Sequence, residues 1–333
     1  NTTISQISNY ALQYFESLKV VKDGKVLGYR HSKSTTQPIL YSTVAVVLTK
    51  HLLGEPLESV KDEIELILAH QSEDGLFKDS VIQCREAEQE DWWGWRHLSL
   101  HCLMALALYD KIAPIEQSYL LNFCNERYLE KYLATRDWGE RVAWTSNELQ
   151  NLGVMLQYAR DYQEMTVADG ILLRIYEEIQ KRQDKKTGLF GQSFQTPWEI
   201  SLGVQSGYHF WLLMHYDNFP LQNVEKIIDN LLSSQNILGG YSINWNSSAC
   251  EDIDSIDPLY RLSRLTNYRN DEIQKSLKRA LPQILVNLNI DGGWVFKRNE
   301  ELKVVHSEMY SGVNESNIFF TWFRILGLAY CLL

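Results

Sequence analysis

Four carboxylate side chains lie close together in one short segment: Glu251, Asp252, Asp254 and Asp257. Carboxyl groups this near to one another cannot all ionise, so the pKa of at least one should rise. On a helix Asp254 shares a face with Glu251 and Asp257. A carboxyl group held protonated in a dry pocket is an effective general acid. The cluster predicts acid catalysis by Asp254, Asp252 and Asp257, although Asp residues at a helix start can also be simple caps.

A second set of polar and aromatic side chains falls near the starts of other helix-length segments. His97 and His101 are four residues apart and share a helix face, as do Glu148 and Asn151, which are three apart. With Arg96, the two histidines would suit an acidic head group such as a carboxylate or diphosphate. The predicted substrate-binding residues are Arg96, His97, His101, Trp95, Trp144, Asn147, Glu148, Trp198, Gln205, His209, Trp245, Glu315, Phe319 and Trp322. Taken singly, each can also be a half-buried residue with an ordinary packing role.

A repeating glycine turn organises the segments that carry these residues. Glycines recur at positions 28, 75, 139, 188, 240 and 293, mostly after Gln or Asn and before an aromatic residue. The segment before each turn is amphipathic, and the segment after it is less charged and richer in aromatic residues. Glycine at such a turn permits the positive φ that ends a helix. The pattern therefore predicts pairs of helices, one outer and one inner.

Twelve helices can be placed, beginning with an outer one and ending with an inner one. We expect them near 3–19, 38–52, 56–71, 91–110, 114–132, 142–162, 164–183, 198–217, 220–235, 251–267, 270–289 and 315–333. Six such pairs form a closed all-α (α/α)6 barrel, or toroid, and no linker or change of composition divides residues 1–333. We therefore expect a single domain. The alternative is an open α-solenoid that only binds partners.

The Gln-x-x-x-Gly-aromatic turn resembles the QW repeat of squalene–hopene cyclases, oxidosqualene cyclases and protein prenyltransferase β subunits, which share this toroid. The Gly-Gly-Tyr turn at 239–241 is followed by Asp252 and Asp254 in a D-x-D pattern, with Ser255 at the third acid position. This segment is similar to the acid motif of class II terpene cyclases. The resemblance implies a single-toroid meroterpenoid cyclase. Asp254 would protonate the terminal alkene of a linear isoprenoid that carries a polar head group, and the chain would then fold into fused rings.

Two alternatives use the same residues differently. In a carbohydrate-active (α/α)6 enzyme, a glycosidase, lyase or epimerase, Asp254 or Asp257 would pair with Glu148, Glu199 or Glu315, and tryptophans would stack on sugar rings. In a non-catalytic binding toroid the acidic cluster would be a solvated surface.

Composition restricts the remaining possibilities. The formal charge is −10 over 333 residues, which argues against nucleic acid as a partner. There is no apolar run long enough for a membrane span, although peripheral membrane contact is compatible with the sequence. Five scattered cysteines and no apparent signal peptide predict a cytoplasmic location. We expect no cofactor and no metal, with Mg²⁺ at the acidic cluster as the weaker alternative. The oligomeric state is not predicted.

Overall fold

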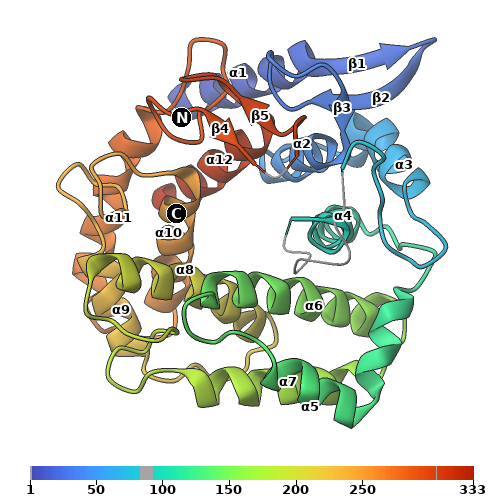
Figure 1. The fold of residues 1–333 in the computed structure, drawn as a ribbon. Helices are drawn as coiled ribbons and strands as arrows, with labels where there is room; N and C mark the ends of the chain where they lie inside the picture. The colour runs from blue at the N-terminus through green and yellow to red at the C-terminus, as the bar shows by residue number, and fades with distance from the viewer. Residues whose placement is uncertain (1, 83–92, 305) are drawn as a thin grey trace.

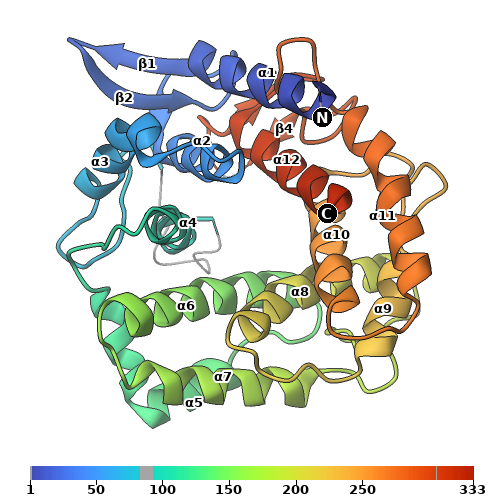
Figure 2. The same ribbon diagram turned by 180° about the vertical axis from the view of Figure 1, so that it is seen from behind.

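The computed structural model describes residues 2–82, 93–304 and 306–333. Within them, helices alternate between an outer and an inner position around a ring (Figures 1 and 2). The inner helices are α2 (Leu40–Leu52), α4 (Trp95–Leu108), α6 (Val142–Tyr162), α8 (Pro197–Tyr216), α10 (Ala249–Ser263) and α12 (Ile318–Leu332). The outer helices are α1 (Thr2–Leu18), α3 (Lys61–Ala69), α5 (Glu126–Ala134), α7 (Ala168–Arg182), α9 (Val224–Ser233) and α11 (Asn270–Leu285).

The inner helices close into a ring. Each contacts the next in chain order, and α12 packs against α2, so helices from both ends of the chain meet. This closure confirms the predicted (α/α)6 barrel and excludes the open solenoid. The inner helices run in the same direction, because an outer helix returns the chain between each pair. Their N-terminal ends therefore lie at one end of the barrel, which we call the mouth. No helix among the described residues is both long and apolar enough to cross a membrane.

The helix pattern follows the sequence closely, with local exceptions. Helix α6 has the predicted bounds. The predicted helix 114–132 is instead a 3-10 helix, η2 (Ser118–Cys124), followed by α5. The break lies at Asn125, whose extended backbone and side chain, which accepts a hydrogen bond from the Tyr128 N–H, make it the N-cap of a new helix. The predicted helix 91–110 begins at Trp95, and residues 91 and 92 lie outside the described part.

Short elements that the periodicity did not predict connect the helices. Strands β1 (Lys19–Lys22), β2 (Lys25–Arg30) and β3 (Pro38–Ile39) form an antiparallel sheet in that order. A two-residue pair, β4 (Leu302–Lys303) and β5 (Tyr310–Ser311), precedes α12, and the 3-10 helix η1 (Leu57–Val60) precedes α3. Strands this short are set by their tertiary neighbours rather than by a sequence period.

The recurring glutamine braces each turn to the next outer element. Gln71 Nε2 donates to the carbonyls of Gly75 at 3.0 Å and Ile115 at 2.7 Å. Gln235 Nε2 likewise donates to Gly239 O and Ser276 O, both at 2.8 Å. Each glutamine therefore satisfies the backbone of its own turn and joins it to a segment about forty residues further on. This hydrogen bonding explains why the repeat carries glutamine.

The aromatic residue of the turn is fastened to the inner helix that follows. The backbone N–H of Phe77 donates to Ser99 Oγ at 2.8 Å, and that of Trp294 donates to Thr321 Oγ1 at 2.9 Å. In the same way the Tyr241 N–H donates to Asp252 Oδ1 at 2.9 Å. Asp252 thus occupies a position of the repeat that elsewhere carries a hydroxyl side chain and holds the turn.

Gly239 is the position where this turn most needs glycine. Its φ is +101°, and an added Cβ would lie 2.1 Å from the Arg279 carbonyl oxygen, whereas Gly24 has φ +75° and open space around it. We expect Gly239→Ala to lower the free energy of unfolding by about 1–3 kcal/mol more than Gly24→Ala, because both changes strain the backbone but only the first also displaces α11. Urea unfolding of the two variants measures the difference. Equal losses would show that the turn can move away from α11.

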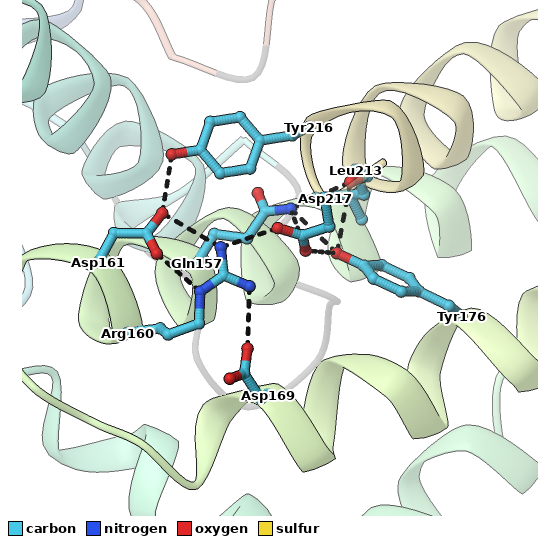
Figure 3. A network of polar contacts seen from close by, with 8 residues as sticks. All are labelled: Gln157, Arg160, Asp161, Asp169, Tyr176, Leu213, Tyr216 and Asp217. Carbon is cyan, nitrogen blue, oxygen red and sulfur yellow. Dashed lines mark hydrogen bonds and ion pairs between the residues drawn. The ribbon is translucent and has the colours of Figure 1, made fainter. Parts of the chain in front are cut away.

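A polar network fastens the opposite end of the barrel (Figure 3). Arg160 Nη2 lies 2.8 Å from Asp217 and Nη1 lies 3.1 Å from Asp169, so one guanidinium joins α6 to α7 and to the end of α8. Tyr176 donates its hydroxyl proton to Asp217, and Gln157 Nε2 donates to the same carboxylate at 3.0 Å. Burial alone would raise the pKa of Asp217, but these donors outweigh burial and lower it. The network therefore holds α6, α7 and α8 together at the end of the barrel opposite the mouth.

Candidate active site

Asp254 lies on α10 and has the properties of a buried acid. The residue is 5% exposed, and its carboxyl group has no hydrogen-bond partner among the described residues. Burial, followed by the nearby carboxylates of Glu251, Asp257 and Asp252, raises its pKa well above the usual value. The raised pKa favours the protonated form of this carboxyl group, which is the form that can donate a proton.

The two other predicted acids are held in ion pairs. Asp252 binds Arg324 of α12, and it also accepts a hydrogen bond from Ser247 Oγ at 3.0 Å. Arg324 donates further to the carbonyls of Ser247 at 3.0 Å and Phe296 at 2.9 Å. It therefore joins α12 to the segment before α10 and to the segment after α11. Asp257 forms an ion pair with Arg261, one helical turn further on. Of the three acids, only Asp254 has no ion-pair partner in the described residues.

Histidines and aromatic rings fill the space between α2, α4 and α12. His97 Nδ1 lies 2.9 Å from the Tyr41 hydroxyl, and His101 Nδ1 lies 2.7 Å from the His97 carbonyl. The ring centroid of His101 is 5.6 Å from those of both Phe319 and Trp322. Burial and the nearby His101, His209 and His306 hold the pKa of His97 well below its usual value. His97 and His101 of α4 are therefore brought together with Phe319 and Trp322 of α12, and the two imidazoles are neutral.

The buried histidines of the inner helices predict that the folded protein loses stability in acid. Burial lowers the pKa of His101 and of His209 to about 4, from 6.5 for a free side chain. The unfolded chain then binds more protons than the folded one between these values, so stability falls as the pH drops from about 6.5 to about 4. We expect His209→Gln to reduce the slope of unfolding free energy against pH by about 1.4 kcal/mol per pH unit in this window. Denaturant unfolding at several pH values measures the slope, and an unchanged slope would contradict the assignment.

A small pocket opens between α4, α5 and α6. It is lined by Arg96, Tyr119, Tyr132, Glu148, Asn151 and Leu152. The Arg96 guanidinium lies 4.5 Å from the Tyr119 ring centroid, and Glu148 accepts a 2.6 Å charged hydrogen bond from Arg136. Asn151 Nδ2 lies 3.4 Å from Asn147 Oδ1. The ion pair with Arg136 fixes the position of the Glu148 carboxyl group.

The remaining predicted residues either make contacts within and between inner helices or are exposed at the mouth. His209 on α8 lies 2.9 Å from Ser146 Oγ on α6, and Gln205 Nε2 donates to Ser201 Oγ at 3.2 Å. The side chains of Trp198 and Trp245 are exposed near the N-terminal ends of α8 and α10.

Two glutamates considered as partners for Asp254 have other roles. Glu199 completes the capping box of α8, and Glu315 accepts hydrogen bonds from the backbone N–H groups of Gly312 and Ser34. Glu199 and Glu315 therefore stabilise local backbone.

Residues that sequence reasoning did not assign to the site complete it. Tyr41 and Ser146 are neighbours of histidines from different helices, which a single sequence cannot reveal. Arg324 had a signal, because it is a lone charge in an apolar C-terminal segment and such a charge needs a buried partner. The described residues contain no group of three His, Cys, Asp or Glu side chains that could hold a metal ion.

The fold and the inner-helix side chains define the protein as an (α/α)6 toroid with a polar and aromatic interior. The sequence matches no protein-family model and no curated protein. Similar solved structures include the GH76A alpha-1,6-mannanase from Salegentibacter sp. HEL1_6, with 10% identity, 98% of each chain covered and a TM-score of 0.56. The GH76 alpha-mannanase of Bacteroides thetaiotaomicron has 11% identity, covers 98% of this chain and 94% of its own, and has a TM-score of 0.52. A possible GH105 family member from Salmonella enterica has 12% identity, coverages of 98% and 93%, and a TM-score of 0.50.

These comparisons correct the resemblance to class II terpene cyclases, which is wrong. The similar structures are carbohydrate-active toroids, so the isoprenoid substrate and carbocation chemistry are withdrawn with it. The physical reason lies in the turn: its glycine, glutamine and aromatic residue fasten neighbouring helices and specify the fold alone. The first acid of the D-x-D pattern, Asp252, belongs to that fastening.

Proposed function

We propose that the protein is a carbohydrate-active enzyme that cleaves glycosidic bonds, with Asp254 as the proton donor. The observation that carries the proposal is the buried Asp254 carboxyl group, which lacks an ion-pair or hydrogen-bond partner among the described residues and has a raised pKa. Cleavage of a glycosidic bond needs such a group to protonate the leaving oxygen. The fold that this chain shares with carbohydrate-cleaving enzymes supports the same chemistry.

Glu148 is the proposed partner of Asp254. It is 7% exposed on inner helix α6, and its pairing with Arg136 suits it to act as an ionised base or nucleophile. Helix α8 lies between α6 and α10 in the ring and packs against both. Ser201, Gln205 and Tyr208 share one face of α8, since they are spaced by four and three residues. Their polar groups would bind the hydroxyls of a sugar placed between the two carboxyl groups.

The test is a screen for bond cleavage. The protein would be incubated with oligosaccharides of different sugars and linkages, including α-1,6-linked mannose, and released reducing ends would be measured. We expect release from at least one linkage class, with loss of release in Glu148→Gln. Binding of a glycan without any release across the panel would overturn the proposal and leave the non-catalytic toroid.

A further inference from the structure

Tryptophans recur at the N-terminal ends of three successive inner helices and in the segment that leads into a fourth. Trp95 is the first residue of α4, Trp144 is the third of α6 and Trp198 is the second of α8. Trp245 lies four residues before α10. Because the inner helices run in the same direction, these indoles lie at the same end of the barrel.

The four indoles differ in how far the protein covers them. Trp95 is partly buried under the Lys78 ammonium group at 4.7 Å, and Trp144 is partly buried with the Arg141 guanidinium 5.7 Å from its ring. Trp198 is 59% exposed and Trp245 is 74% exposed. The other described tryptophans are buried or partly buried. Large exposed aromatic rings are unfavourable in water unless a ligand covers them.

We propose that Trp198 and Trp245 are stacking platforms for successive sugars of a neutral glycan chain, an inference that rests on the proposed function. A sugar ring presents an apolar face of C–H groups that packs on an indole, while its hydroxyls remain free for water or polar side chains. Trp198 lies at the start of α8, and Trp245 lies in the segment that leads into α10, the inner helix packed against α8, so the two platforms would contact different sugars of one chain. The formal charge of −10 disfavours a polyanionic glycan.

One of the two platforms lies close in sequence to the candidate acid. Trp245 precedes the helix that carries Asp254, and Asp254 is buried more than one helical turn inside α10. A glycan that contacts both Trp245 and Asp254 would therefore have to extend from the mouth into the barrel. This arrangement favours oligosaccharides over single sugars.

Protein docking is the competing explanation for one of the two platforms. The aliphatic side chains of Ile237, Leu238 and Ile243 are also exposed near Trp245, and they would suit an apolar partner. They do not account for Trp198, which lies on α8 and not in the segment between α9 and α10. A glycan explains both tryptophans with one ligand.

The experiment measures glycan binding separately from turnover. Intrinsic tryptophan fluorescence and calorimetry would be recorded with neutral linear hexasaccharides of mannose, glucose and xylose, for the wild type and for Trp198→Ala, Trp245→Ala and Trp198→Tyr. We expect about fivefold to tenfold weaker binding for each alanine variant and near-normal binding for Trp198→Tyr, which keeps a stacking ring. Tyr10→Ala, which removes an exposed ring from outer helix α1, is the control.

The outcomes separate this inference from the proposed function. Binding that the alanine variants lose, in a protein that cleaves nothing, would support the platforms and overturn the cleavage proposal. Cleavage with unchanged Michaelis constants and unchanged binding in both alanine variants would overturn the platforms alone. Loss of self-association or of protein binding, with glycan binding intact, would assign the exposed surface to docking instead.

Discussion

Asp254→Asn is expected to reduce the rate of glycan cleavage by about 100-fold to 10,000-fold. An amide has nearly the same shape as the carboxyl group but cannot give up a proton to the leaving oxygen, and general acid catalysis contributes a factor of this size. In the wild type, activity should fall as the pH rises through the raised pKa of Asp254, because only the protonated form acts. Rates of reducing-end release from the substrate found in the screen measure both effects.

The fold of Asp254→Asn should be at least as stable as the wild type at neutral pH and above. The folded pKa of Asp254 is raised, so the wild type loses stability as the pH rises from the unfolded pKa toward the folded one, and the amide removes this loss. Glu65→Gln, at an exposed position on outer helix α3, is the matched carboxylate-to-amide control and should keep full activity. Full activity in Asp254→Asn would refute its role as proton donor.

Arg324→Met is expected to lower the free energy of unfolding by about 3–5 kcal/mol. Arg324 is 1% exposed, and its loss leaves the Asp252 carboxylate buried without a countercharge. The Ser247 carbonyl loses the Arg324 donor in the same step, and the Phe296 carbonyl keeps only the Ala249 N–H. Methionine keeps much of the side-chain volume, so the loss reports on charge and hydrogen bonding more than on a cavity. Guanidinium unfolding monitored by circular dichroism measures the change.

A double variant provides the control for this pair. Asp252→Asn combined with Arg324→Met removes both charges, so it should be more stable than Arg324→Met alone despite carrying one more substitution. A loss below about 1 kcal/mol in the single variant would contradict the assigned role, because breaking a buried ion pair costs several times that amount.

The sequence predicted the architecture because the repeat is local. Each glycine turn and its flanking amphipathic segments lie within one stretch of chain, so the helices could be placed, and α6 was placed to the residue. The break at Asn125 was missed because a single capping side chain decided it. The five short strands were missed because long-range neighbours fix them.

The site was predictable only where partners are close in sequence. The pairing of Asp257 with Arg261 follows the i, i+4 spacing of a helix and could have been predicted. The partner of Asp252 lies 72 residues away, and no pattern in one sequence points to it. The burial of Asp254 inside the acidic cluster agrees with the prediction that one carboxyl of the cluster has a raised pKa. The cyclase prediction was wrong because fold-specifying residues were taken as evidence of chemistry.

The contact between α12 and α2 also limits how such a protein can evolve. An open array of helix pairs can gain or lose a unit at its ends, because each unit needs only its neighbours. A closed ring has no end. Removing one pair of helices would leave the apolar faces of its two neighbours uncovered, and adding one would disturb the contacts between all the neighbouring inner helices. A change in the number of pairs would therefore disrupt the whole ring, whereas side chains at the mouth and the lengths of the connecting loops can change without opening it.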